Sequence, residues 1–106
     1  MYKYRKYLGL VEMGNLKKIF GDNARVIVLE HLIRNPDSMT YPSGIAEETG
    51  LSNSTVSRVM EPLLKLDMVR EIGPSKRVKS FELNKDNGFT KALLSFYEEI
   101  GKISNG

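Results

Sequence analysis

The chain has 106 residues, of which 41% are hydrophobic and 27% are charged, and its formal net charge is +3. These proportions are typical of one folded globular domain and exclude a disordered chain, in which hydrophobic residues would be scarcer and charges more frequent. The sequence has no cysteine and one histidine, which excludes disulfides and thiolate metal sites, so we expect no metal and no cofactor.

Positive charge gathers in two segments of the chain. Residues 1–20 carry one set of basic side chains, Lys3, Arg5, Lys6, Lys17 and Lys18. Residues 70–79 carry the other set, Arg70, Lys76, Arg77 and Lys79. Positive charge that is limited to two segments suits a protein that contacts phosphates with one side of its surface. No apolar run approaches the ~20 residues of a bilayer span, and no signal peptide is evident, so we expect a cytoplasmic protein with no membrane partner.

The first elements in chain order are short. Residues 3–13 suit a helix, because four apolar or aromatic residues recur at helical spacing, namely Tyr4, Tyr7, Leu8 and Val11. The alternation of tyrosines with basic residues would equally suit an extended arm. A short apolar turn then follows, which contains Leu16, Ile19 and Phe20 and which Gly21 should end.

A core helix is expected over residues 23–34, with Asp22 as its N-cap and Pro36 preventing its continuation. Its buried side should carry Val26, Leu29 and Ile33, with Ile27 and Leu32 beside them. His31 lies near the edge of this apolar side. We interpret it as a structural histidine, because the sequence gives no reason to expect a carboxylate or a second histidine near it.

Two more helices, a hairpin and a last helix complete the chain. Pro42 and Ser43 open a short helix over residues 45–49, and Ser52 caps a second helix over residues 53–66. Pro62 should bend or break this second helix, at a cost of about 3 kcal/mol if it stayed straight. Strands are expected over 68–72 and 78–83 around a turn at 73–77, and the last helix over 89–103.

The two central helices have the residues of a helix-turn-helix at the required spacing. Ala46 supplies the small side chain needed where the helices touch, and Gly50 lets the chain reverse within a few residues. Val56 and Val59 recur at helical spacing and should pack the inside of the corner. The spacing therefore predicts a helix pair of the kind that enters the major groove of DNA.

The opposite face of the second helix is polar and is our candidate for DNA contact. Arg58 can donate two hydrogen bonds to guanine, and Asn53 can bridge adenine. Phosphate contacts suit the hydroxyl groups near the start of the helix. The candidate residues on this helix are Ser52, Asn53, Ser54, Thr55, Ser57 and Arg58. The hairpin adds Lys76, Arg77 and Lys79, whose like charges favour a polyanion nearby.

The segments around these residues resemble the winged helix-turn-helix regulators of the ArsR and MarR type, especially small archaeal members. The likeness covers about residues 20–83 and rests on the stretches 20–29, 45–58 and 63–69. It implies a dimer on a pseudo-palindromic operator, with the hairpin as a wing that reaches the minor groove or the backbone. Two features depart from the family: Pro62 within the second helix, and the lack of the cysteines with which many ArsR-type regulators sense metals.

The expected fold is therefore α+β, mainly α: a winged helix-turn-helix domain with a two-stranded wing and flanking N- and C-terminal helices. We expect a single domain, 1–106, made of a basic and aromatic helix or arm (1–20), a winged-helix core (21–83) and a dimerisation helix (88–103). The last helix predicts a homodimer, because the spacing of its apolar residues alternates between four and three positions, as in a coiled coil. They are Phe89, Leu93, Phe96, Ile100 and Ile103.

The function expected from these features is sequence-specific binding of double-stranded DNA by a nucleoid-associated transcriptional regulator. No enzyme signature is present in the sequence. Two alternatives remain open. Plasmid partition proteins and chromatin-type proteins that coat DNA also use small dimeric winged helices, and a winged helix can instead serve as a protein-interaction module.

Overall fold

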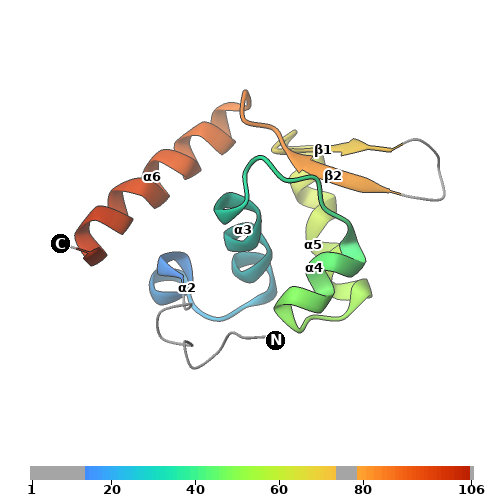
Figure 1. Cartoon of the computed structure of the whole chain (residues 1–106), viewed down its shortest axis with the longest axis horizontal. Helices are drawn as coiled ribbons and strands as arrows, with labels where there is room; N and C mark the ends of the chain where they lie inside the picture. Colours follow the sequence, from blue (N-terminus) through green and yellow to red (C-terminus); the bar gives the residue numbers. More distant parts are fainter. Residues whose placement is uncertain (1–13, 74–78, 106) are drawn as a thin grey trace.

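The computed structural model describes residues 14–73 and 79–105 of the chain. These residues form five helices and a two-stranded antiparallel sheet (Figure 1). The elements are α2 (Asn15–Phe20), α3 (Ala24–Arg34), α4 (Pro42–Thr49), α5 (Asn53–Lys65), β1 (Val69–Ile72), β2 (Ser80–Leu83) and α6 (Gly88–Asn105). The predicted fold class, mainly helical with one hairpin, is confirmed. The helix or arm predicted over residues 3–13 lies outside the described residues.

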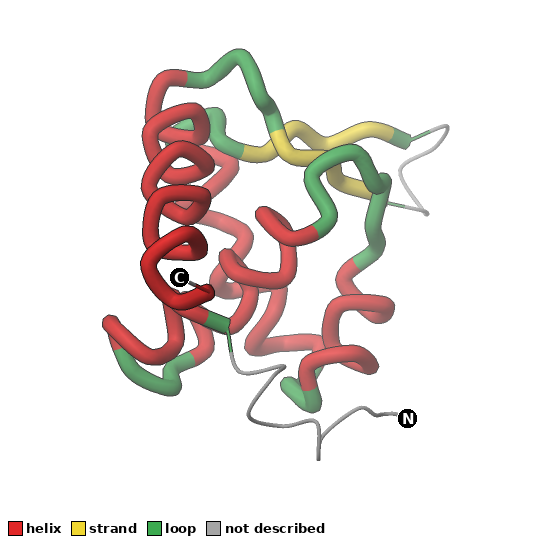
Figure 2. The backbone as a smooth tube through the Cα atoms, turned by 60° about the vertical axis from the view of Figure 1, so that its left-hand side comes forward, coloured by secondary structure: helices red, strands yellow, loops and turns green. Residues whose placement is uncertain are grey.

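Helix α3 lies at the centre of the molecule, with α4 and α5 on one side and α2 and α6 on the other (Figure 1). Figure 2 shows the hairpin extending away from the helices. The core between these elements is aliphatic and includes Val28, Ile45, Val56, Met60 and Val69, each at most 1% exposed. None of the helices that the structure describes is long and apolar enough to cross a membrane.

Short polar residues and glycines set the helix ends. Ser52 caps α5 as predicted, because its hydroxyl accepts a hydrogen bond from the Thr55 backbone N–H. The prediction that Asp22 caps α3 is wrong: Asn23 accepts the hydrogen bond from the Val26 N–H, and Asp22 lies 3.6 Å from Lys17. Gly50 ends α4 in the left-handed region, at φ 82°, which glycine adopts without steric cost.

The buried side of α3 differs from the one predicted. Val28, Leu32 and Ile33 are buried, whereas Val26 and Leu29 are only partly buried against the core. The predicted stripe is therefore rotated, because α3 is covered from two sides, by α4 and α5 and by α2 and α6. Pro62 does not break α5, which continues to Lys65.

The strands of the hairpin are shorter than predicted, over Val69–Ile72 and Ser80–Leu83. Val69 pairs with Leu83 and Ile72 pairs with Ser80. Phe81 and Leu83 are both buried, and Thr40 adds an isolated bridge to Phe81 at the edge of the sheet. The Ser80 hydroxyl donates to the Ile72 carbonyl at the open end of the strands. The predicted turn falls almost wholly within residues 74–78, outside the described part of the chain.

A buried carboxylate joins α2, α3 and α6. Glu30 of α3 is 5% exposed and accepts hydrogen bonds from the backbone N–H groups of Leu16 (3.3 Å) and Lys17 (3.2 Å). Burial of Tyr97, on α6, and the neighbouring Glu30 carboxylate raise the pKa of Tyr97 to about 12. Gly14 makes room for the carboxylate, since a Cβ there would lie 1.5 Å from Glu30 Oε2. No local pattern in the sequence indicates this contact, because Glu30 lies 14 and 13 positions from Leu16 and Lys17.

Candidate nucleic-acid interface

The corner between α4 and α5 has the packing that the sequence predicted. Ile45 and Val56 are fully buried, Ala46 is 8% exposed and Val59 is 9% exposed. The backbone N–H of Gly50 bonds to the Ala46 carbonyl, which closes the end of α4 before the chain reverses. The inner face of α5 is thereby fixed against the core, and its opposite face remains on the outside of the molecule.

The start of α5 is organised by its own hydroxyl groups. The Ser52 hydroxyl donates to Thr55 Oγ1 (2.9 Å), lies 3.2 Å from Ser54 Oγ, and accepts from the Thr55 N–H. Thr55 is half-buried, whereas Ser52 and Ser54 are exposed. Ser52 therefore has a structural role as the cap, and Ser54 presents its hydroxyl to solvent next to the unpaired N–H groups of the first turn.

The remaining candidate side chains on α5 lie together on its exposed face. Asn53, Ser57 and Arg58 are all exposed. Within residues 14–73 and 79–105, Arg58 has no hydrogen bond or ion pair to another residue, so its five N–H donors face solvent. A guanidinium in this state is available to a ligand without first breaking a contact in the protein.

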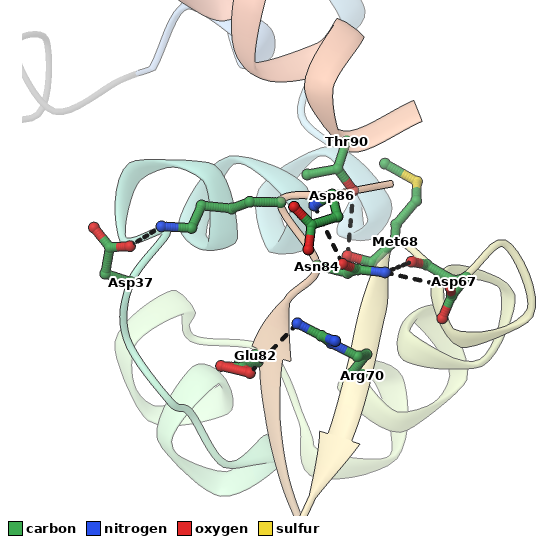
Figure 3. Close-up of polar contacts among 9 residues, drawn as sticks. Asp37, Asp67, Met68, Arg70, Glu82, Asn84, Asp86 and Thr90 are labelled. Carbon is green, nitrogen blue, oxygen red and sulfur yellow. Dashed lines mark hydrogen bonds and ion pairs between the residues drawn. The ribbon is translucent and has the colours of Figure 1, made fainter. Parts of the chain in front are cut away.

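The basic residues of the hairpin have different surroundings. Arg70 of β1 lies 3.9 Å from Glu82 of β2, so its charge is compensated within the sheet (Figure 3). Lys79 is exposed and has no partner in the described part of the chain. Lys76 and Arg77 lie outside the described residues. Of the basic residues predicted for the hairpin, the structure thus leaves Lys79 free for phosphate and pairs Arg70.

The base of the hairpin is tied to the helices by polar contacts (Figure 3). The amide of Asn84, after β2, donates to the Asp67 carbonyl (2.9 Å) and to its carboxylate (3.3 Å), before β1. Asp67 has a left-handed backbone, at φ 62°, which short polar residues tolerate. Lys85 pairs with Asp37 in the loop after α3. These contacts join the two ends of the hairpin to each other and to the loop after α3.

The residues predicted for dimerisation divide into two groups in the structure. Leu93 and Ile100 are partly buried and pack against the chain's own core. Phe89, Phe96 and Ile103 are 61%, 40% and 78% exposed. Two residues of α2, Ile19 and Phe20, are also exposed, although they were not predicted as dimerisation residues. The centroid of the Phe20 ring lies 6.3 Å from that of the Phe96 ring.

Helices α2 and α6, which carry the exposed apolar residues, lie on the opposite side of α3 from α5 (Figure 1). Helices α2 and α6 lie to the left of α3 in Figure 1, and α4, α5 and the hairpin lie to its right. A second copy could therefore cover the first side without hiding the second. The arrangement leaves α5 and the hairpin together on one side, as a contact with a DNA duplex would require.

Neither a family profile nor a curated protein matches the sequence. Solved structures of regulators do match the fold. MepR of Staphylococcus aureus, a transcription regulator of the multidrug efflux pump MepA, has a TM-score of 0.59 and 17% identity over 96% of this chain and 82% of its own. The adhesin competence repressor AdcR of Streptococcus pyogenes has a TM-score of 0.57 and 20% identity, over 94% and 76% of the two chains.

A structure of the S. aureus MepR–DNA complex also matches, with a TM-score of 0.57 and 17% identity over 85% of this chain and 75% of that one. At these identities the likeness is one of fold. It agrees coarsely with the ArsR and MarR type expected from the sequence. The chain has the winged-helix fold seen in these transcription regulators.

Proposed function

We propose that the protein is a sequence-specific double-stranded DNA-binding transcriptional regulator of the ArsR and MarR type, close to its small archaeal members. It acts as a dimer on a pseudo-palindromic operator and works in the cytoplasm at the nucleoid. The observation that carries this proposal is the exposed polar face of α5, with Arg58 unpaired among the described residues. The opposite face of the same helix is fixed in the core.

In this proposal the candidate residues have two kinds of role. Arg58 donates to guanine O6 and N7, and Asn53 bonds to adenine in the major groove. Ser54 and Ser57, with Ser52 and Thr55 at the helix start, lie where phosphate contacts are made. Lys79 is available for phosphate, and we assign the same role to Lys76 and Arg77 on the hairpin.

Dimer formation follows from the small area that one recognition helix can read. A single helix contacts only a few base pairs, whereas two helices about 34 Å apart occupy successive major grooves on one side of the duplex. The exposed apolar residues of α2 and α6 lie on the side away from α5, where a second copy can pack.

A selection from random duplexes, followed by affinity measurements across a salt series, tests the proposal. Arg58→Ala should cost about 1 to 3 kcal/mol on the selected site and relax its sequence preference, because a base contact is lost. Lys79→Ala should weaken binding to all sequences and lower the log–log salt slope by about one. Lys91→Ala is the matched control, since it removes an exposed charge from α6, outside both α5 and the hairpin.

Several outcomes would contradict parts of the proposal. Unchanged affinity of Arg58→Ala for the selected site would remove the base-reading role. No binding to any duplex at low salt would favour a module that binds protein. Footprinting separates the remaining roles: one protected operator supports a regulator, whereas protection that spreads outward with concentration supports a partition or DNA-coating protein.

A further inference from the structure

A pocket of about 220 Å³ lies between α3, the loop that follows it, and α4. All the residues that line it belong to these three segments, so it is separate from the exposed face of α5 and from the apolar side of α2 and α6. His31 and Leu32 come from α3, Ser38 and Met39 from the loop, and Glu48 from α4. The volume suits a molecule with a single ring, below the usual 300–1,000 Å³ of sites for drug-sized ligands.

The polar atoms of this pocket leave a gap that the protein does not fill. His31 Nδ1 lies 3.9 Å from Glu48 Oε1, which is too long for a hydrogen bond. Within residues 14–73 and 79–105, neither side chain has another hydrogen-bond partner. One N–H of the Asn35 amide donates to the His31 backbone carbonyl, at 2.8 Å. Among the described residues, neither the Glu48 carboxylate nor His31 Nδ1 therefore has a donor within hydrogen-bond distance.

Glu48 is the acidic residue among those that line the pocket, and none of the described lining residues is a lysine or an arginine. Burial is the largest influence on the pKa of His31 and lowers it below its ordinary value, although the nearby Glu48 carboxylate acts in the opposite direction. The imidazole is then neutral at neutral pH. With its N–H on Nε2, the Nδ1 atom that lies beside Glu48 can accept a hydrogen bond. The Glu48 carboxylate can only accept. Both therefore favour a ligand that carries positively charged N–H donors.

We propose that this pocket binds a small organic cation, a primary ammonium or an amidinium attached to a compact apolar body. A ligand nitrogen about 2.9 Å from each acceptor fits over their 3.9 Å separation, so one cationic group can bond to His31 and Glu48 together. Leu32 forms an apolar wall, and the flexible side chain of Met39, 56% exposed, can fold over the rest of the ligand.

The single histidine of the chain provides a direct reporter for this site, because its imidazole protons need no assignment among others. Proton NMR spectra would be recorded at a fixed pH of about 7.5, above the usual histidine pKa, during titration with benzylamine. We expect the His31 signals to shift and saturate at millimolar ligand. Benzoate, which has the same ring and the opposite charge, should leave them unchanged.

Two variants on α4 complete the test. Glu48→Gln removes the proposed partner of the cation and should raise the benzylamine dissociation constant at least tenfold. Glu47→Gln removes an exposed charge from the neighbouring position, which does not line the pocket, and should change it less than twofold. Far-UV circular dichroism checks that both variants fold, which is expected because both glutamates are exposed.

Any of three results would overturn the proposal. The first is the absence of a saturable His31 shift with benzylamine. The second is a shift of similar size and affinity with benzoate, which would mean that the positive charge is irrelevant. The third is an equal loss of benzylamine affinity in Glu47→Gln and Glu48→Gln, which would mean that the acidic helix attracts the cation without a specific site. None of these readouts depends on DNA binding, so the proposed function is tested separately.

Discussion

Glu30 supports three helices through one carboxylate. It accepts hydrogen bonds from the N–H groups of Leu16 and Lys17 at the start of α2 and lies beside Tyr97 of α6. Buried donors that lose their acceptor pay the full cost of desolvation. Glu30→Ala should therefore lower the free energy of unfolding by about 2 to 4 kcal/mol, from the lost charged hydrogen bonds and the space left behind.

Urea denaturation followed by circular dichroism measures this loss. Glu47→Ala is the control, because Glu47 is exposed and such substitutions usually change stability by less than about 0.5 kcal/mol. Equal effects of the two substitutions would mean that the Glu30 contacts contribute no net stability.

His31 gives the stability of the protein a dependence on pH. Its pKa is lowered in the folded state by burial, with Glu48 raising it and Arg34 lowering it further. Between the folded pKa and the ordinary value near 6.5, the unfolded chain binds the extra proton and the folded chain does not. The contribution of His31 is therefore complete above about pH 6.5 and is lost as the pH falls through the folded pKa.

The slope from this one proton is at most about 1.4 kcal/mol per pH unit. It can be measured from the free energy of unfolding of the unmodified protein and of His31→Gln on both sides of pH 6.5. We expect the substitution to flatten the decline toward acid pH. A curve of unchanged shape in His31→Gln would assign the decline to other groups.

At the scale of elements, Pro62 stands out because α5 continues through it. Proline has no N–H to donate to the Arg58 carbonyl one turn earlier, and in a helix interior it is about 3 kcal/mol less favourable than alanine. Pro62→Ala should therefore raise the free energy of unfolding by about 1 to 3 kcal/mol in thermal or urea denaturation. A loss of stability would instead mean that the proline sets a helix shape on which the packing of Leu63 depends.

The elements that sequence reasoning predicted are those whose signals are local. Gly50, Ser52 and the spacing of Val56 and Val59 lie within a few residues of the structures they determine, and the helix pair formed as expected. The cap of α3 was missed by one position because Asp22 and Asn23 are both good caps, and the choice depends on which residue has the extended backbone.

The parts that sequence reasoning missed are contacts between elements. Nothing in the sequence near Glu30 or Glu48 indicates that Glu30 meets the start of α2 or that Glu48 meets His31. The pairing of Arg70 with Glu82 likewise depends on strand register, and it reduces the positive charge predicted for the hairpin. Counting charges along the chain could identify candidate residues, but it could not separate paired from unpaired ones.

At the scale of the whole molecule, the proposed dimer has a specific test. Phe96 and Ile103 are exposed on α6, whereas Leu93 packs on the chain's own core, so the first two are the better targets. Phe96→Asp with Ile103→Asp should give a folded monomer with much weaker operator binding, because charges would enter the surface between the copies.

Analytical ultracentrifugation of the unmodified protein and the double variant measures this effect. Glu98→Lys with Glu99→Lys is the control, since it changes two exposed residues of the same helix that are not apolar. A monomer at tens of micromolar in the unmodified protein would contradict the dimer, and a dimeric double variant would place the interface elsewhere.

Gly14 has a consequence for how the sequence can vary among relatives. The Glu30 carboxylate occupies the space that a side chain at position 14 would need, so substitutions at the two positions depend on each other. We expect homologues that keep a glutamate at position 30 to keep glycine at position 14. Those with a larger residue at position 14 should carry a shorter one at position 30 and another acceptor for the start of α2. In an alignment, this pair would therefore appear as a covarying contact between positions distant in the chain.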